Sequence, residues 1–453
     1  MRQAIHFLKR SHGSQPIDIP ERAAYTRQQE DGSSHERLTE MREQAMHTVH
    51  EVMEMSGHII DSWTLPKAWD TIMDRGGNFD VEEIQVGATK DDTSYVRIKV
   101  EAPNDEVLEQ IISQLQQLGA VLLHADDVHV TKVEQDGVLP DKFYSTTNLP
   151  TQVRLNGQWV TVENIEMDVA IAIDREHTRA YCRPMHDVRI GEEVVVGHDG
   201  IRVQPYARAR GHDDFAFMQS DVSSEKVKVR AIHNIARQMK EVRAHQGKIL
   251  FVLGPAVIHT GAGRYVAELI RMGYIQVIFG GNAIITHDVE SALFGTSLGV
   301  NLESGEQVVG GHRNHLRAIN TVRGIGSIEK TIQSGLLREG ITYEAHQHNI
   351  PMVLAGSIRD DGPMPGVISD MQQAQARMRE EVHGVEMSII VASMLHAIAT
   401  GNILPAHVRT VVVDINQSVV TKLADRGSFQ AAGLVTDVEL FLRELVDFLR
   451  KEQ

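Results

Sequence analysis

The sequence predicts an α/β protein with an open parallel sheet in its C-terminal half, over residues 223–453. Two observations support this prediction. Continuous apolar runs recur after residue 247, with the length and composition of strands that are buried on both faces. Stretches of helical composition separate these runs, which is the order of a doubly wound sheet. The expected strands are Lys248–Leu253, Ile275–Phe279, Met352–Ala355, Ile389–Val391, Val411–Val413 and Gly433–Val435.

A smaller α/β module is predicted at residues 56–137. Its alternating apolar segments and its Gly and Pro breaks give the order βαββαβ, which is that of a ferredoxin-like sandwich. The expected elements are a strand at Gly57–Asp61, a helix at Leu65–Arg75, strands at Asn78–Gly87 and Ser94–Glu101, a helix at Glu106–Leu118 and a strand at Val128–Glu134.

Residues 138–222 contain short alternating segments separated by Gly, Pro and Asn, so we expect a small β-rich subdomain. Its strands are predicted at Gln152–Leu155, Trp159–Glu163, Val169–Ile173, Val194–Val196 and Ile201–Val203. Residues 1–55 are interpreted as an N-terminal extension that is partly helical, with a helix at Glu36–Met55.

The stretch Gly384–Asp414 indicates the function of the C-terminal domain. It predicts a strand, a tight turn, a short helix at Leu395–Ile403 and a second strand that ends at Asp414. In dinucleotide-binding βαβ units, an acidic residue about 20 positions after the phosphate turn binds the ribose. Asp414 follows Ser393 by 21 positions, and the N-terminus of the intervening helix can bind a pyrophosphate. This spacing predicts a Rossmann-like site.

Ligands of parallel sheets bind beyond the carboxyl ends of the strands, so the residues at these positions are the candidates. Two glycines precede Asn282 and Ala283 after one predicted strand, and His287 and Asp288 follow. Another strand precedes Gly356–Pro363, which contains Arg359 for a carboxylate and Asp360 or Asp361 for an amine or hydroxyl.

Composition excludes several classes of protein. The net charge of −16 argues against a nucleic-acid partner, which requires a basic surface. The longest apolar runs are too short to cross a membrane, and one cysteine allows no internal disulfide. We therefore expect a cytoplasmic protein. Histidine is abundant, with 23 residues, but no group has the spacing of a zinc site, so no metal is predicted.

Several motifs are similar to those of one family. They are GHIIDSWTLPKAWDTIMDRGGNFDVEEIQVG, FYSTTNLP, SSEKVKVRAIHNIA, GPAVIHTGAG, GGNAIITHDVESALFGTSLG, GGHRNHLRAIN, AGSIRDDGPMP, ASMLHAIATGNILP, VVVDIN and VTDV, in this order along residues 56–449. They resemble the archaeal-type ornithine cyclodeaminases of the LOR/SDH-domain family, which also form the C-terminal half of the cyanobacterial arginine dihydrolase/ornithine cyclodeaminases. The guanidine-removing domain of the cyanobacterial enzymes has no counterpart in this sequence, so arginine hydrolysis is not expected.

The resemblance implies an NAD-dependent conversion of L-ornithine to L-proline and ammonia, in which a hydride is removed and later returned. The implied NAD contacts, carried over by motif, are Asn282, Ala283, Asp361, Ser393, Met394, Leu395, His396, Asp414, Asp437 and Val438. The chemistry also needs a cation for the substrate carboxylate and a base for its amines. The candidates are Lys226 or Arg359 for the carboxylate, and His287 with Asp288 or Asp360 for proton transfer.

Two alternatives remain open at this stage. One is another NAD-linked amino-acid dehydrogenase, of the opine or saccharopine type, which would form or consume NADH. The other is a non-catalytic sensor of NAD or an amino acid. The ionisable side chains at the predicted strand ends favour an enzyme. The N-terminal extension and the ferredoxin-like module lead us to expect a homo-oligomer.

Overall fold

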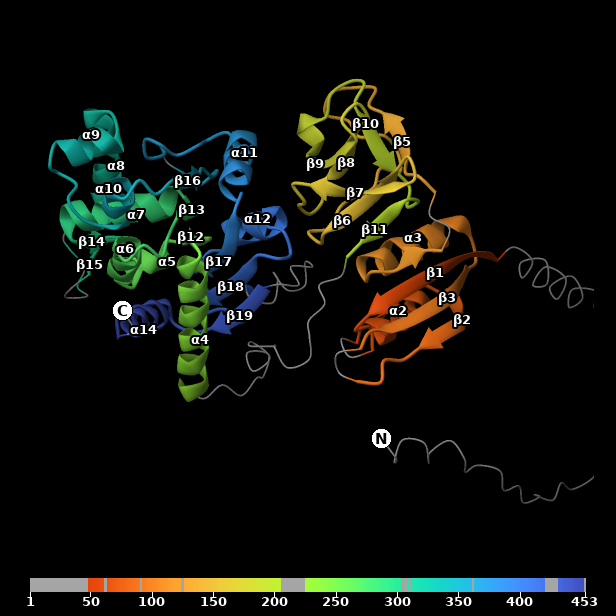
Figure 1. Cartoon of the computed structure of the whole chain (residues 1–453). Helices are drawn as coiled ribbons and strands as arrows, with labels where there is room; N and C mark the ends of the chain where they lie inside the picture. The colour runs from red at the N-terminus through yellow and green to blue at the C-terminus, as the bar shows by residue number, and fades with distance from the viewer. Residues whose placement is uncertain are drawn as a thin grey trace, which may run out of the picture. The chain divides into compact units, whose positions relative to one another are not determined.

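The computed structural model describes residues 48–60, 63–89, 92–123, 126–204, 225–302, 306, 308, 311–360, 362–419 and 431–451. Side chains are described throughout these ranges, except for residues 225–227, 312 and 431. Most of the predicted N-terminal extension therefore lies outside the described residues. We describe three modules in chain order (Figure 1).

The first module is a four-stranded antiparallel sheet in the order β2-β3-β1-β4, with two helices packed on one face. Strict alternation along β3 buries every second side chain, including Val96, Ile98 and Val100, against the helices. Its elements are β1 (Val49–Gly57), α2 (Thr64–Asp74), β2 (Asn78–Gln85), β3 (Ser94–Ala102), α3 (Asp105–Gln117) and β4 (Val121–Leu122). This is the predicted βαββαβ order.

Two predictions for this module are wrong: the position of its first strand and the pairing of its last strand. The first strand is Val49–Gly57, where the sequence analysis places the end of a helix. Its apolar residues fit a period of two as well as a helical period, and nine residues of pairing with β3 favour the strand. The fourth strand is the short β4, whereas β5 (His129–Lys132), within the predicted last strand, pairs with β10 of the next module.

The second module is the predicted β-rich subdomain, with the strand order β11-β6-β7-β9-β8-β10-β5. Val153, Ile171 and Ile201 are among the side chains that fill its core. Its remaining strands are β6 (Thr151–Leu155), β7 (Gln158–Glu163), β8 (Ala170–Asp174), β9 (Arg179–Arg183), β10 (Glu193–Val196) and β11 (Ile201–Val203), with a 3₁₀ turn at Met185–Asp187. The buried Gln116 side chain of α3 donates a hydrogen bond to His198 O, which ties the first module to the second.

The third module is a six-stranded parallel sheet in the order β16-β13-β12-β17-β18-β19. The first three strands in the chain lie on one side of the sheet and the last three on the other, which is the Rossmann order. Successive strands are therefore added outward from the centre, first on the β12 side and then on the β17 side, so the strand order reverses between β12 and β17. The strands are β12 (Lys248–Leu253), β13 (Val277–Gly281), β16 (Met352–Ala355), β17 (Val385–Val391), β18 (Arg409–Asp414) and β19 (Ala431–Val435).

Helices cover both faces of this sheet, and alternate residues of each strand face two separate cores. Phe251 and Leu253 pack with one group of helices, whereas Leu250 and Val252 pack with the other. The first group is α4 (Glu225–Ala244), α5 (Ala256–His259), α6 (Gly263–Arg271), α7 (Asn282–Phe294), α8 (Asn314–Ile325), α9 (Ile328–Gln333), α10 (Ile341–Gln347) and α14 (Val438–Lys451). The second group is α11 (Met371–Glu381) and α12 (Leu395–Ile403).

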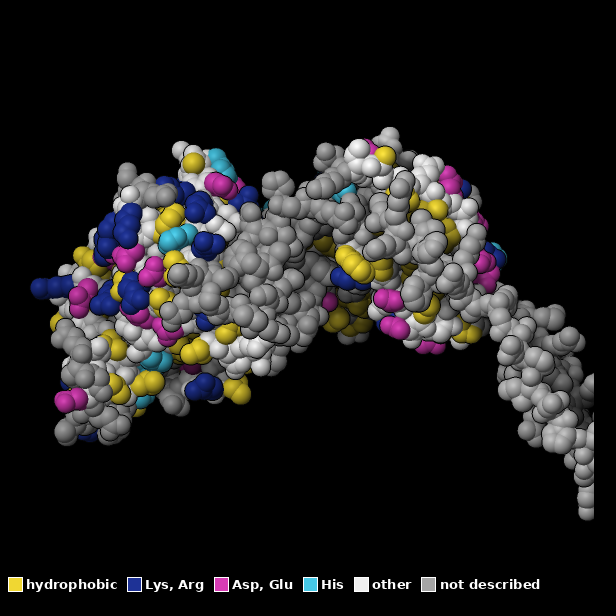
Figure 2. All heavy atoms as spheres, turned by 90° about the horizontal axis from the view of Figure 1, so that it is seen from below, with side chains coloured by type: hydrophobic (Ala, Val, Ile, Leu, Met, Phe, Trp, Pro, Cys, Tyr) yellow, Lys and Arg dark blue, Asp and Glu magenta, His cyan; other side chains and the backbone are white. Residues whose placement is uncertain are grey.

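The described surface carries charges of both signs together with exposed hydrophobic side chains. Figure 2 shows Lys and Arg side chains interspersed with Asp and Glu side chains on the third module. Among the described helices, none combines the length and the apolar character that a membrane span requires.

A buried ion pair joins the second module to α11. Arg379 Nε lies 2.8 and 2.9 Å from the two carboxylate oxygens of Glu166, which is only 5% exposed. Two backbone hydrogen bonds of 2.8 Å, from Met167 N to Asn402 O and from Ala406 N to Asn148 O, extend the same contact. Burial raises the pKa of the Glu166 carboxyl, although Arg379 opposes this shift.

We predict that Arg379→Met lowers the free energy of unfolding by about 3 kcal/mol, because it leaves a buried carboxyl group without its partner. The matched control is Arg377→Met on the same helix, whose partners Glu380 and Glu381 form surface pairs. That change should cost less than about 1 kcal/mol. Urea unfolding of the three proteins measures both values, and equal effects would contradict a structural role for the buried pair.

Candidate dinucleotide site

The candidate site lies at the carboxyl ends of the parallel strands, where β12 and β17 are neighbours. Gly254 N donates a 2.9 Å hydrogen bond to Val391 O, so the two strand ends remain paired. A Cβ atom on Gly254 would lie only 1.7 Å from Ala392 O, which no side chain could tolerate. Ala392 has a φ of 50°, an uncommon conformation for a residue with a side chain. Glycine is therefore required at position 254, because the backbone of Ala392 occupies the space that a side chain would need.

The turn after β17 leads directly into α12, as the sequence predicts. Ser393 is buried, whereas Met394 and Leu395 are 43% and 71% exposed. Met394 is the N-cap residue of α12, and it makes no side-chain capping bond. The first N–H groups of this helix therefore have no side-chain cap, and together with the helix dipole they can bind an anionic phosphate group.

His396 lies beside the end of β13. A Cβ atom on Gly281 would lie 2.8 Å from His396 Cε1, so glycine makes room for the imidazole. Burial lowers the pKa of His396, and its ring also hydrogen-bonds to the Ala355 backbone at the end of β16. A neutral imidazole is thereby held across the carboxyl ends of β13 and β16.

Asn282 begins α7 at the same edge, and its side chain is 9% exposed. Its Oδ1 accepts hydrogen bonds from Met364 N at 2.9 Å and from Thr286 Oγ1 at 3.2 Å. These bonds fix the orientation of the amide group. Ala283 follows on the exposed side of the helix. The structure therefore brings Asn282 and His396 to one edge, as the strand-end argument predicts.

The last predicted cofactor positions lie at the ends of β18 and β19. Asp414 accepts a 2.7 Å hydrogen bond from Asn416 N through Oδ1. Asp437 caps α14 by accepting a 3.0 Å bond from Leu440 N, and Val438 is buried in the core beneath. Asp437 and Val438 thus have structural contacts of their own, and any cofactor contact would add to these. The prediction for Asp361 lies outside the described residues.

The candidates for the substrate carboxylate are less well defined. Arg359 is exposed, in a turn that Asp360 closes by accepting a 2.7 Å hydrogen bond from Ser357 N. Lys226 lies in the first turn of α4, and its side chain is among those not described. Neither residue makes a described contact with the edge that holds Asn282 and His396.

A cluster of polar side chains surrounds His287 of α7, which lies one to two helical turns from the sheet edge. His287 Nδ1 lies 2.9 Å from Glu290 Oε2, and the His287 ring packs against His259 with centroids 4.6 Å apart. His259 Nδ1 lies 2.7 Å from Ser297 Oγ, and His315 lies near the other side of His287, with ring centroids 6.4 Å apart. We call these five side chains the histidine cluster.

Glu290 is the fully buried acid of the histidine cluster. Burial opposes its ionisation, but hydrogen bonds from His287, Thr296 and Gly299 N outweigh this effect, and the pKa of its carboxyl is lowered. An ionised Glu290 holds the proton of His287 on Nδ1, which leaves Nε2 as the proton acceptor. Burial and the neighbouring His287 lower the pKa of His259 to about 4, so this ring is neutral near pH 7.

Asp288 has a different task from the one predicted for it. It is 3% exposed, and its two oxygens accept hydrogen bonds from Ile341 N at 2.9 Å and Thr342 N at 2.7 Å. It therefore caps the N-terminus of α10. Burial raises the pKa of its carboxyl against these bonds. Because both oxygens are occupied, we replace Asp288 by Glu290 as the partner of His287.

The sequence analysis did not identify Glu290, His259, Ser297 or His315 as a group with His287. Glu290 follows His287 by three positions on one helix, and this spacing places two side chains on the same face. That signal was available in the sequence. The other three come from α5, β14 (Thr296–Ser297) and α8, and only the tertiary structure brings them together. Among the described residues, no group of three His, Cys, Asp or Glu side chains is arranged to hold a metal ion.

The strand-end geometry fits a dinucleotide. The N-terminus of α12, which has no side-chain cap, suits a pyrophosphate, and Asp414 lies one strand further, where a ribose hydroxyl would bind. The exposed Met394 and Leu395 supply an apolar surface for a ring. Fold and site together define a Rossmann-fold protein that binds a dinucleotide.

Comparisons with known proteins identify the family. Residues 233–445 match the family described as arginine dihydrolase ArgZ-like, C-terminal, Rossmann fold. Residues 50–149 match the LOR/SDH bifunctional enzyme conserved region, and 150–232 match the ArgZ-like C-terminal first region. The ornithine cyclodeaminase of Methanocaldococcus jannaschii is 50% identical over 88% of this chain and 96% of its own length. That of Methanopyrus kandleri is 50% identical over 88% and 97%.

Longer relatives and solved structures are also similar to this chain. The bifunctional arginine dihydrolase/ornithine cyclodeaminase AgrE of a Nostoc species is 46% identical over 88% of this chain, which spans 58% of AgrE. The apo structure of the cyanobacterial arginine dihydrolase ArgZ has a TM-score of 0.80 at 38% identity, over 89% of this chain and 59% of ArgZ. A LOR/SDH protein of Methanococcus maripaludis has a TM-score of 0.69 at 47% identity, over 72% and 99%.

The chain belongs to the ornithine cyclodeaminase family, which confirms the resemblance found in its motifs. The fold class and the NAD cofactor expected from that resemblance are confirmed as well. The individual site residues stay predictions.

We predict that Gly254→Ala sharply weakens NAD binding and destabilises the fold by about 1–3 kcal/mol, because the new methyl group collides with Ala392 O. The matched control is Gly324→Ala in α8, where an added Cβ atom meets nothing within 4 Å. That change should leave NAD binding intact and stabilise the helix by up to about 1 kcal/mol. Calorimetric NAD titration and thermal unfolding measure both effects. Normal NAD affinity in Gly254→Ala would place the cofactor elsewhere.

Proposed function

We propose that this protein converts L-ornithine to L-proline and ammonia, with NAD as a cofactor that is regenerated in each cycle. The proposal rests on the similarity of this chain, over nearly the full length of the relatives, to archaeal proteins named ornithine cyclodeaminase. The sequence identity is 50%, 50% and 49% for the three relatives compared. The strand-end site and the histidine cluster supply the groups that this reaction needs. An oxidation without a returning reduction would leave NADH as a product, which distinguishes a dehydrogenase from this proposal.

The residues proposed to hold NAD are those at the strand ends. Ser393 and the first N–H groups of α12 would bind phosphate oxygens, and Asp414 would bind ribose hydroxyls. Asn282 and His396 would contact the portion of the cofactor above β13. When bound, NAD supplies the chemistry of hydride removal from the substrate Cα and of hydride return to the cyclic imine.

His287 is proposed to exchange protons with the substrate amines. An alkylamine has a pKa near 10, so a base must remove a proton before the amine can act as a nucleophile. The Nε2 atom of His287 is the acceptor, because Glu290 holds Nδ1 in its protonated form. His259 packs against the same ring and remains neutral, so it adds no charge that would oppose protonation of His287.

Arg359 and Lys226 keep the task predicted for them, as the cations proposed for the substrate carboxylate. The exposed turn that carries Arg359 follows β16. Asp360 lies on the same turn and contributes to the electrostatic environment of His396, whose pKa its charge tends to raise. We propose that Asp360 shapes this turn, since Ser357 N and Ser357 Oγ both hydrogen-bond to its carboxylate.

We predict that the purified protein forms proline and ammonia in equal amounts from L-ornithine with catalytic NAD⁺, without lasting absorbance at 340 nm. His287→Ala should lower kcat by at least about 10²-fold, because general-base catalysis typically contributes this much. NAD affinity should be retained, since His287 lies below the strand-end site. Glu290→Gln should lower kcat and shift its pH profile, because the tautomer of His287 is no longer fixed.

The matched control is His348→Ala, since the described contacts of this exposed histidine, at the C-terminal end of α10, are with Glu344. It should keep full activity. Steady accumulation of NADH with ornithine would favour a dehydrogenase, and tight NAD binding without any turnover would favour a sensor. Full activity in His287→Ala would exclude the histidine cluster as the site of proton transfer.

A further inference from the structure

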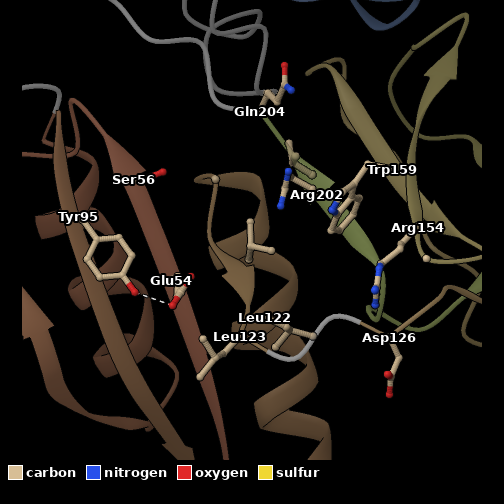
Figure 3. Close-up of a pocket in the computed structure, with 14 residues that line it drawn as sticks. Glu54, Ser56, Tyr95, Leu122, Leu123, Asp126, Arg154, Trp159, Arg202 and Gln204 are labelled. Carbon is tan, nitrogen blue, oxygen red and sulfur yellow. Dashed lines mark hydrogen bonds between the residues drawn. The ribbon is translucent and has the colours of Figure 1, made fainter.

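A second pocket lies outside the Rossmann-fold module, between the first and second modules (Figure 3). Its volume is about 830 Å³, which is within the range of small-molecule sites. Every lining residue precedes residue 205, so the pocket is built without the strand ends described above. It is lined by Glu54, Ser56, Tyr95, Gly119, Val121, Leu122, Leu123, Asp126, Arg154, Gly157, Trp159, Arg202, Val203 and Gln204.

One wall of this pocket presents the arginine Arg202. The Arg202 guanidinium stacks over the Trp159 ring, 4.2 Å from its centroid. Within the described part of the chain, Arg202 makes no hydrogen bond and no ion pair. Stacking holds the guanidinium plane in place, and its donors are spaced to bind a carboxylate with two hydrogen bonds. Arg154 lines the same wall, opposite Trp159 in the pairing of β6 with β7.

The other wall is acidic. Tyr95 Oη donates a 2.5 Å hydrogen bond to Glu54 Oε1, and Arg97 contacts the same oxygen at 2.9 Å. These bonds hold the pKa of Glu54 below its usual range, so its carboxylate is ionised near pH 7. The other oxygen, Oε2, has no hydrogen-bond partner among the described residues. It can therefore accept a bond from a cationic ligand.

Between the two walls lies an apolar surface. Figure 3 shows Glu54 and Tyr95 on one side, Arg202 with Trp159 on the other, and Leu122 and Leu123 between them. A ligand that satisfies all three parts has a carboxylate at one end, a cation at the other, and methylene groups between. Inorganic phosphate satisfies only the arginine wall, and a diamine satisfies only the glutamate wall.

We propose that this pocket binds a basic α-amino acid as a second ligand, apart from the reaction site. Its α-carboxylate pairs with Arg202, and its side-chain cation pairs with Glu54. The methylene chain lies over Leu122 and Leu123. Because residues of β1 and β11 both line the pocket, a bound ligand links the first module to the second. The proposal does not depend on turnover, and it stands or falls separately from the cyclodeaminase activity.

The test is calorimetric titration of the full-length protein with L-arginine, which is offered in place of ornithine so that no turnover occurs. The wild-type protein should bind one arginine per chain. Arg202→Ala and Glu54→Gln should each raise the Kd at least tenfold. The matched control is Arg179→Ala, since this exposed arginine of the second module pairs with Glu163 away from the pocket. It should bind like the wild type.

Ligand analogues test each wall separately. Norvaline lacks the terminal cation, and 1,4-diaminobutane lacks the carboxylate, so both should bind at least tenfold more weakly than L-arginine. Absence of arginine binding, or equal binding by the wild type and both pocket variants, would overturn the proposal. Binding of inorganic phosphate that depends on Arg202, without arginine binding, would replace it by a simple anion site.

Discussion

The structure depends on the contact between the ends of the two central strands, β12 and β17. Gly254 lies so close to Ala392 O that a methyl group has no space, and Ala392 adopts a left-handed conformation there. This geometry directs the chain from β17 into α12 and aims the uncapped N-terminus of α12 at the sheet edge. Asn402, near the other end of α12, accepts a hydrogen bond from Met167 N, so the second module also contacts α12.

Much of the fold follows from local patterns. Buried parallel strands are continuous apolar runs, and all six were located from such runs, although β13, β17, β18 and β19 differ from the predicted bounds by a few residues. The helix at Leu395–Ile403 was predicted at its observed bounds. The strand Val49–Gly57 was missed because its apolar residues fit both periods, and pairing with β3 decides between them. Such pairing is a long-range contact that a single segment does not reveal.

The site was predictable to the extent that it follows from sheet topology. The rule that ligands bind at strand ends selected Asn282, Ser393 and Asp414 as candidates without any knowledge of side-chain geometry. The histidine cluster depends instead on contacts among α5, α7, β14 and α8, which no local sequence pattern predicts. Asp288 shows the converse: a carboxylate beside a histidine suggested catalysis, yet its burial against α10 makes it a helix cap.

The most direct test of the central claim follows the hydrogen on the substrate Cα. L-Ornithine that carries deuterium at C2 is converted with catalytic NAD⁺, and the proline is analysed by mass spectrometry. If hydride is removed and returned within one site, the proline retains deuterium at C2 and no reduced cofactor accumulates. Proline without the label, or deuterium collected in the NADH pool, would contradict the account.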